Sequence, residues 1–434
     1  MTHLAARISL PIQSISAAAV CMLAVGALAQ TTTTPTTPAT PAQAPVPTKI
    51  SNPQLEWTQA EAPILTHTVE LTSRKDFVKA GEQYFSPDGN WMIFQGIPVP
   101  PAGQEPDTHY SMFIARLNRD AKGNITSIQT PTRVSPKGSA NTCGWFNPVK
   151  PGQIIFGSTL VPPKDQSGPG YKRLGGKYAW QFPSEMNIVT RFLPELAAQM
   201  VDAPAQYGTA TPATPLFDRP GYDAEGSLSP DGRFLLYAHV DEQRSKALGR
   251  PDADLYIYDM KTKKQIPIVA KAGYDGGPFF SPDMSWICYR SDRHGDGNLQ
   301  LFVAQLDYSK DGSIVGIKRE VQLTDNEHVN WAPYFHPSGR FLIYTTSELG
   351  HHNYEVYAIE FDPEKPMNEL WKFRITHGPG FDGLPAFSRD GKNMIWCAQR
   401  GSLGNGDTHP SSQIWATNFD AQALLERAAN KSTF

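Results

Sequence analysis

Short apolar runs alternate with turn residues along most of the chain, and one phrase of this kind recurs six times. Each copy has an apolar run, a turn of the Ser-Pro-Asp-Gly type and a second apolar run. The copies are YFSPDGNWMIF from Tyr84, WFNPVKPGQIIF from Trp145, SLSPDGRFLLY from Ser227, FFSPDMSWICY from Phe279, YFHPSGRFLIY from Tyr334 and AFSRDGKNMIW from Ala386. Proline sets φ at the first turn position, aspartate accepts local backbone hydrogen bonds and glycine takes the left-handed position. Each copy therefore predicts a β-hairpin.

The spacing of the copies predicts the fold. Their equivalent positions, called anchor positions below, are Pro87, Pro148, Pro230, Pro282, Pro337 and Arg389, and they are 61, 82, 52, 55 and 52 residues apart. A period near fifty is typical of one four-stranded propeller blade, and a further β-rich segment follows each hairpin. A β-sandwich also has many short strands, but it does not repeat one turn phrase at similar spacing. We predict an all-β protein that forms a six-bladed β-propeller.

The ends of the repeat region predict how the ring closes. No outer strand follows the last copy, because AQALLERAAN from Ala421 has helical character. Upstream of the first copy, HTVELTS from His67 carries a Leu-Thr pair like that of VQLTD from Val321. We predict that this N-terminal segment is the outer strand of the last blade, which protects the sheet edge. Further outer strands are expected at Arg133, Ile266, Val321 and Phe373, and none is evident for the second blade.

The flanking segments predict export and a tether. Residues 1–29 combine Arg7, an apolar stretch and Ala27-Leu28-Ala29, a pattern typical of a signal peptide cleaved after Ala29. We therefore expect a periplasmic or secreted protein. Residues 30–60 are predicted to be a Thr/Pro-rich flexible linker, 61–420 the propeller and 421–434 a C-terminal helical tail. No later apolar run is long enough for a transmembrane segment.

Composition and motifs favour a binding module over an enzyme. The chain has 39 Lys and Arg against 42 Asp and Glu, so it lacks the basic field that nucleic acid recruits. Cys143, Cys288 and Cys397 are too few and too sparse for a disulfide framework, and we expect them to pack in the core. No GxSxG, HExxH, CxxC or GxxxxGK(S/T) motif occurs.

The repeats resemble a known family. YDGGPFFSPD from Tyr274, SDRHGDGNLQLF from Ser291 and FDGLPAFSRDGK from Phe381 are similar to the WD-like repeats of TolB-like β-propellers, and the resemblance covers roughly residues 65–419. It implies a periplasmic protein of the Tol-Pal envelope system whose propeller binds a peptidoglycan-associated lipoprotein. The separate α/β domain that precedes the propeller in TolB has no counterpart before His67. The expected partner is therefore an envelope protein or peptide.

One repeated position carries candidate ligand-binding side chains. Seven residues before the anchors stand Ala80, Asn141, Asp223, Asp275, Asn330 and Asp382. This position begins the innermost strand, so we expect the side chains to ring one mouth of the central channel. Carboxylates and amides there favour Ca²⁺, with Asp223, Asp275 and Asp382 as ligands, or a positively charged peptide end. The alternative is that they only cap strands or form Asx turns. Glu82 and Glu225, five before their anchors, add charge at this mouth.

A second set of candidates supports an enzymatic alternative, a polysaccharide lyase with a metal at the channel mouth. It recruits His351, His352 and the aspartates of the ring, with His294 at the matching corner of the preceding blade. Adjacent residues on a strand point to opposite faces, and no pair has a recognised metal-ligand spacing. In the long excursion from Leu160 to Phe217, Trp180 and Phe182 are expected to pack against the blade or to line a recognition surface. The Ser291-Asp292-Arg293 corner is interpreted as structural.

Overall fold

The computed structural model describes residues 53–164, 172–174, 177–179, 183–200, 210–404 and 406–430. The predicted signal peptide, most of the predicted linker, and Trp180 and Phe182 lie outside the described residues. No helix among those that are described is long and apolar enough to cross a membrane.

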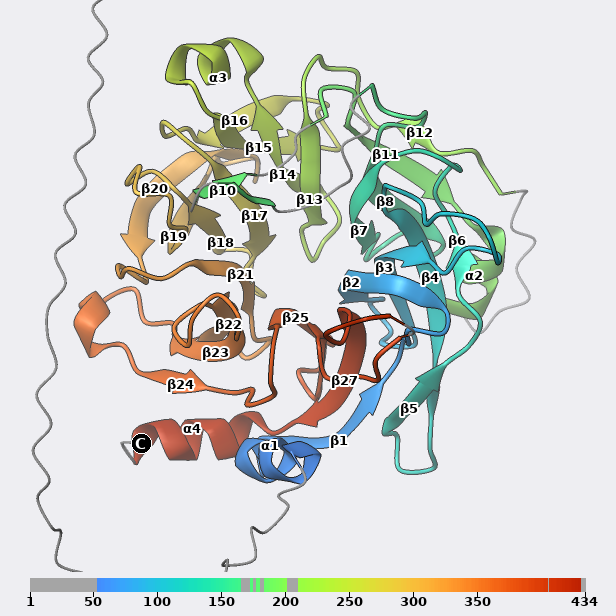
Figure 1. The fold of residues 1–434 in the computed structure, drawn as a ribbon. Helices are drawn as coiled ribbons and strands as arrows, with labels where there is room; N and C mark the ends of the chain where they lie inside the picture. The colour runs from blue at the N-terminus through green and yellow to red at the C-terminus, as the bar shows by residue number, and fades with distance from the viewer. Residues whose placement is uncertain are drawn as a thin grey trace, which may run out of the picture. The chain divides into compact units, whose positions relative to one another are not determined.

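Six antiparallel sheets surround a central channel (Figure 1), which confirms the predicted propeller. Blade one contains β2 (Phe77–Phe85), β3 (Trp91–Pro98), β4 (Ser111–Arg119), β5 (Ile125–Ile128) and β6 (Thr132–Arg133); blade two contains β7 (Asn141–Phe146), β8 (Gln153–Ser158), β11 (Asn187–Phe192) and β12 (Thr214–Pro215). Blade three contains β13 (Asp223–Leu228), β14 (Phe234–Val240), β15 (Ala253–Asp259) and β16 (Gln265–Val269); blade four contains β17 (Asp275–Phe280), β18 (Trp286–Ser291), β19 (Gln300–Tyr308) and β20 (Ile314–Gln322). Blade five contains β21 (Asn330–Phe335), β22 (Phe341–Thr346), β23 (Glu355–Glu360) and β24 (Lys372–Arg374); blade six contains β25 (Asp382–Phe387), β26 (Asn393–Ala398), β27 (Gln413–Phe419) and β1 (Leu65–Glu70).

The remaining elements are short. They are the β9 (Lys172–Leu174) and β10 (Lys177–Ala179) hairpin and the helices α1 (Pro53–Glu61), α2 (Pro194–Met200), α3 (Glu242–Leu248), η1 (Met367–Glu369) and α4 (Ala421–Ala429). The outer strand of blade two, which the sequence did not indicate, is the two-residue β12. Blade one has both β5 and the expected β6 on the outer side of β4.

The turn chemistry of the repeat works as the sequence predicts. In blade three the Ser229 hydroxyl donates to Asp231 at 2.6 Å and accepts from the backbone N–H of Phe234 at 2.9 Å. Gly232 takes a φ of 69°, in the left-handed region that lacks a steric cost only for glycine. The turn thus fixes the register of the two inner strands.

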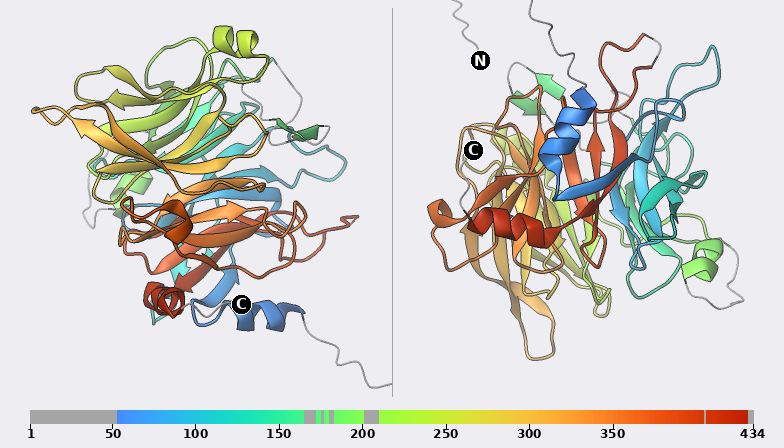
Figure 2. Two further views of the ribbon diagram at one scale, coloured as in Figure 1. Left: turned by 90° about the vertical axis from the view of Figure 1, so that its left-hand side faces the viewer. Right: turned by 90° about the horizontal axis from the view of Figure 1, so that it is seen from below.

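The ring closes with its N-terminal strand, as predicted. β1 pairs antiparallel with β27, with Val69 opposite Ala416 and Glu70 opposite Trp415. The Leu71 N–H continues the ladder by donating to the carbonyl of Ile414 at 2.7 Å. Figure 2 (right) shows α1 and β1 in blue beside β27 and α4 in red. The two ends of the described chain therefore complete one blade.

Helix α1 adds a buried ion pair to this closure. The Glu61 carboxylate accepts from the Arg400 guanidinium at 3.0 Å, and Arg400 also pairs with Asp382 at 2.8 Å. The Arg400 side chain is fully buried, and Trp57 stacks over it at 4.4 Å. The prediction placed residues 53–60 in a flexible linker. The helix forms there because these buried contacts hold it on blade six.

Candidate functional site

Every innermost strand carries a bulge at the same point of the repeat. The register with the second strand shifts there in all six blades. The residues five before the anchors have positive φ values between 50° and 58°, and they are Glu82, Cys143, Glu225, Gly277, Ala332 and Leu384. A left-handed residue is costly unless it is glycine, and a bulge redirects its side chain. The same conformation in six blades makes this ring a feature of the architecture.

Aromatic rings fill the channel one level further along the innermost strands. Tyr84 lies 4.8 Å from Trp145 and 5.6 Å from Phe279, between ring centroids, and Phe279 lies 5.0 Å from Tyr334. Tyr84 belongs to blade one and Phe279 to blade four, which face each other across the axis. Contacts between opposite blades leave no open channel at this level. We call these four residues the aromatic floor.

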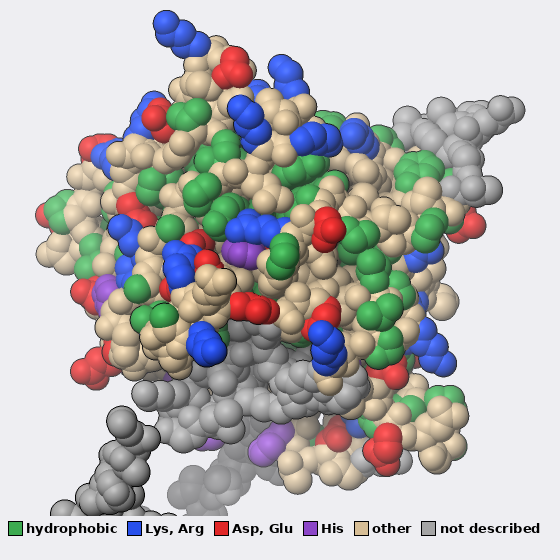
Figure 3. All heavy atoms as spheres, turned by 90° about the horizontal axis from the view of Figure 1, so that it is seen from above, with side chains coloured by type: hydrophobic (Ala, Val, Ile, Leu, Met, Phe, Trp, Pro, Cys, Tyr) green, Lys and Arg blue, Asp and Glu red, His purple; other side chains and the backbone are tan. Residues whose placement is uncertain are grey.

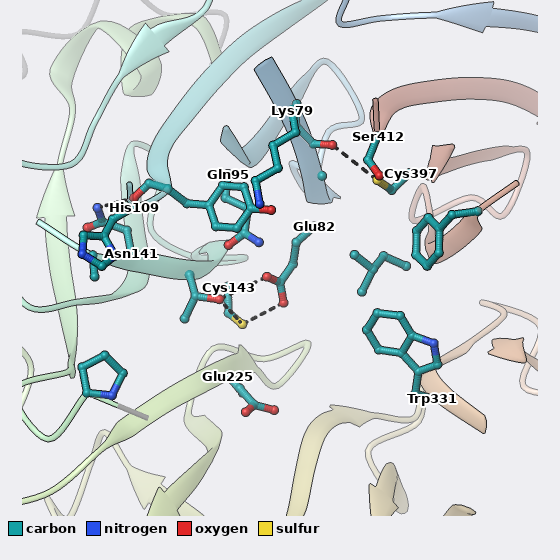
Figure 4. A pocket seen from close by; sticks show the side chains of 18 of the residues that line it. Lys79, Glu82, Gln95, His109, Asn141, Cys143, Glu225, Trp331, Cys397 and Ser412 are labelled. Atoms are coloured by element: carbon teal, nitrogen blue, oxygen red, sulfur yellow. Dashed lines mark hydrogen bonds between the residues drawn. The ribbon is translucent and has the colours of Figure 1, made fainter. Parts of the chain in front are cut away.

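A cavity of about 1360 Å³ lies in the channel on the side where the innermost strands begin. Four of the six bulge residues line it: Glu82, Cys143, Glu225 and Leu384. Lys79, Gln95, Asn141, Arg290 and Trp331 also line it. Figure 4 shows Glu82 near the middle of the cavity, with Cys143 beside it and Glu225 on another wall.

Glu225 lies in a saturated network. Its carboxylate accepts from the Tyr274 hydroxyl at 2.7 Å, from the Gly277 N–H at 2.6 Å and from Arg290 at 3.1 Å. Glycine is required at 277 because a Cβ there would overlap the Arg290 guanidinium. Arg290 thus neutralises Glu225 within the protein.

Glu82 forms no such ion pair within the described part of the chain. It accepts hydrogen bonds from the Thr142 hydroxyl at 3.1 Å and from the Cys143 thiol at 2.9 Å. Among the described residues, no Lys, Arg or His forms an ion pair with it. Burial raises the pKa of Glu82 and the charge of Glu225 raises it further, while the Cys143 hydrogen bond and the charge of Arg290 oppose this rise. Burial also raises the pKa of the Cys143 thiol well above its usual range, so the thiol stays protonated and donates.

Two further polar side chains of blade one, Lys79 and Gln95, each have a group that lacks an ion-pair or hydrogen-bond partner among the described residues. The Lys79 ammonium lies 4.7 Å from the Tyr110 ring centroid, and burial lowers its pKa. No Asp or Glu of the described ranges forms an ion pair with Lys79. Gln95 is 9% exposed, and its buried side-chain oxygen has no hydrogen-bond partner. Neither residue could be singled out from the sequence, because neither stands at a position that recurs as a polar residue in other blades.

The ring predicted at the mouth is buried. Asn141, Asp223, Asp275, Asn330 and Asp382 each begin an innermost strand, and none is more than 3% exposed. Of the five, Asn141 lines the cavity.

The three aspartates of this ring have partners in their own blades. Asp223 contacts the His239 ring nitrogen Nδ1 at 2.9 Å, and Asp275 pairs with Arg293 at 3.1 Å, as Asp382 does with Arg400. Burial raises the pKa of Asp275 to about 6, although Arg293 opposes this. Within the described ranges, no group of three or more His, Cys, Asp or Glu is placed to hold a metal. The Ca²⁺ site at these aspartates stays a prediction.

The amides of the ring have partners too. The Asn141 side chain donates to the carbonyl of Tyr110 at 2.8 Å, and that of Asn330 donates to the Gln300 side chain at 3.0 Å. These bonds tie the start of each innermost strand to the neighbouring structure, as strand caps do.

Histidines lie around the cavity. His351 and His352 line it, together with His109 and His409. The Nδ1 atom of His351 is 3.0 Å from the Tyr354 hydroxyl. His294 instead lies 3.7 Å from Asp325. The Asp292 carboxylate pairs with Arg250 of the preceding blade at 2.7 Å, so this corner links two blades.

The outer surface has mixed charge. On the face drawn in Figure 3, Lys and Arg side chains are interspersed with Asp and Glu. This agrees with the near balance of charges in the sequence.

Comparisons with known proteins support the repeat family. No protein-family model matches the chain. An uncharacterised protein of Agrobacterium fabrum is 27% identical over 171 residues, which is 39% of this chain and 52% of that protein. The Tol-Pal system protein TolB of Nitratidesulfovibrio vulgaris is 30% identical over 132 residues, which is 30% of this chain and 25% of TolB. The matches thus span about half or less of these curated relatives.

Among solved structures, an oligogalacturonate lyase in complex with manganese is 13% identical, with a TM-score of 0.40. The match covers 82% of this chain and 94% of the lyase chain. A score at this level is too low to support an inference about activity.

Proposed function

We propose that this six-bladed propeller, which is similar to TolB-like β-propeller proteins, is a binding module that takes part of a ligand or partner into its channel cavity. The observation that carries the proposal is Glu82, a carboxylate that lines the channel cavity without an ion-pair partner among the described residues. A ligand enters from the side where the innermost strands begin.

The energetics of Glu82 support binding of a cationic group. Keeping a carboxylate in a partly buried site without an ion-pair partner is unfavourable, which is why burial raises the pKa of Glu82. A hydrogen bond to a charged group contributes about 1.5–3 kcal/mol. A ligand ammonium or guanidinium that reaches Glu82 gains this contribution, and it also offsets the cost of burying the Glu82 carboxylate.

We place this binding in the cell envelope. The likeness to TolB of a Tol-Pal system and the predicted signal peptide favour a periplasmic protein that binds an envelope protein or peptide. A peptidoglycan-associated lipoprotein is one such partner. The polysaccharide-lyase alternative stays a prediction.

Photocrosslinking in cells tests the proposal. Benzoylphenylalanine replaces Trp331, which lines the cavity, or Val315, which is 52% exposed on the outer strand β20. After illumination, intact mass and gel mobility report adducts. We expect an adduct from position 331 and none from position 315. Equal adducts at both positions, or none at 331, contradict a binding function of the cavity.

A further inference from the structure

The polar groups of the cavity fall into two sets. In the saturated set the charges pair with each other inside the protein, and in the unsaturated set the charges have no ion-pair partner among the described residues. Glu225 and Arg290 neutralise each other and share hydrogen bonds with Tyr274 and Gly277. Lys79, Glu82 and Gln95 belong to blade one, and Figure 4 shows Lys79 and Gln95 on a different side of the cavity from Glu225, with Glu82 between them. Because the first set is satisfied inside the protein, ligand recognition falls to the second.

The unsaturated set contains one charge of each sign. Neither the Lys79 ammonium nor the Glu82 carboxylate has an ion-pair partner among the described residues. Gln95, nine-tenths buried, adds an amide whose oxygen has no donor. Both charges are partly buried, so each is more costly to leave unpaired than a charge on the outer surface.

We propose that the ligand is a short zwitterion whose ammonium group binds Glu82 and whose carboxylate binds Lys79. This inference rests on the proposed binding function of the cavity and specifies its ligand class. A purely cationic ligand leaves Lys79 unpaired, and a purely anionic ligand leaves Glu82 unpaired. A zwitterion pairs both and adds no net charge to the cavity.

The spacing of the two residues fits a short peptide with free ends. Lys79 and Glu82 are three residues apart on β2, a separation of roughly 10 Å along an extended strand, which the bulge after Gly81 shortens. Two or three peptide residues span a similar length. The cavity of about 1360 Å³ has room for such a ligand, and its backbone amides can bond to Gln95.

Calorimetric titration with trialanine in three forms tests the inference. The forms are the peptide with both ends free, the N-acetylated peptide and the C-amidated peptide. We expect wild type to bind the free peptide at least about tenfold more tightly than either blocked form. This comparison needs no variant, so it stands even if a variant fails to fold.

Two variants test which residue binds each charged end of the peptide. Glu82→Gln should bind the free and N-acetylated peptides equally while still preferring the free carboxyl end. Lys79→Met should show the reverse. Glu105→Gln and Lys75→Met remove the same charges from exposed positions and should behave as wild type.

The outcomes separate this inference from the proposed function. Equal binding of all three peptides by wild type overturns the zwitterion, as does an unchanged end preference in both cavity variants. If trialanine does not bind but the crosslinker at position 331 still yields an adduct, the ligand class is wrong and the binding function stands. If neither is observed, both fail.

Discussion

Replacing Arg400 by methionine should destabilise the propeller far more than the same replacement at Arg74. Both arginines tie blade six to the N-terminal segment. Arg400 pairs with Glu61 and Asp382, and all three side chains are at most 1% exposed. Arg74 pairs with Asp407 at 2.8 Å, but these two side chains are 24% and 23% exposed.

The magnitude follows from burial. Removing one partner of a buried ion pair costs about 3–5 kcal/mol, because the remaining charge stays desolvated, whereas an exposed pair contributes about 0–1 kcal/mol. An unfolding entropy near 2.1 cal/mol/K per residue gives about 0.8 kcal/mol/K for roughly 370 folded residues. Arg400→Met should therefore lower Tm by about 4–6 °C, and Arg74→Met by about 1 °C or less.

Calorimetric melts of both variants at neutral pH give the comparison. Adding Glu61→Gln to Arg400→Met should recover part of the loss, because it removes one of the two stranded carboxylates. Equal Tm values for the two single variants would refute the reasoning that α1 stabilises the closure through this buried pair.

Three further predictions concern charge and closure. Burial lowers the pKa of His336 to about 4, below the ordinary value of about 6.5, so its contribution to stability is complete above pH 6.5 and declines by up to about 3 kcal/mol as the pH falls to 4. The unfolding free energy from urea titrations should fall less between pH 7.5 and 4.5 for His336→Gln than for wild type. An identical fall in both proteins would contradict the role of His336. Glu82→Gln should raise the unfolding free energy at pH 7, because the raised pKa of Glu82 means that its ionised form destabilises the fold. Glu225→Gln should lower the unfolding free energy by about 1–3 kcal/mol, because it weakens the bond to Arg290. Urea titrations in which both variants change the unfolding free energy with the same sign would contradict the assignment of Glu225 as paired and Glu82 as unpaired. Deleting β1, residues 65–70, exposes the edge of β27 and should cause loss of the monodisperse species in size-exclusion chromatography, and a monodisperse product with unchanged Tm would show that closure is dispensable.

The fold was predictable because its signals are local. Proline, aspartate and glycine at fixed turn positions specify a hairpin, and six copies specify a ring. The Leu71-Thr72 pair identified the closing strand. In the structure the Thr72 hydroxyl donates to the Gln413 side chain of β27 at 2.8 Å. Helix α1 was missed because its stability comes from tertiary contacts of Trp57 and Glu61 rather than from its own amphipathic pattern.

The site was only partly predictable. The repeat placed polar residues such as Asp223 at the start of each innermost strand, but their partners lie in other strands and do not show in the sequence. Glu82 and Glu225 occupy equivalent positions, yet only Glu225 forms an ion pair with Arg290, whose charge acts on Glu82 without a direct contact. The sequence predicted Glu82 and Glu225 at this mouth from their place in the repeat, but it did not show the bulge that directs their side chains there.

The most direct test is a crystal structure of the protein with a ligand captured in the cavity. Our account predicts a cationic group of that ligand within about 4 Å of the Glu82 carboxylate, above the aromatic floor. A ligand bound on the outer surface, with Glu82 still unpaired, would contradict it.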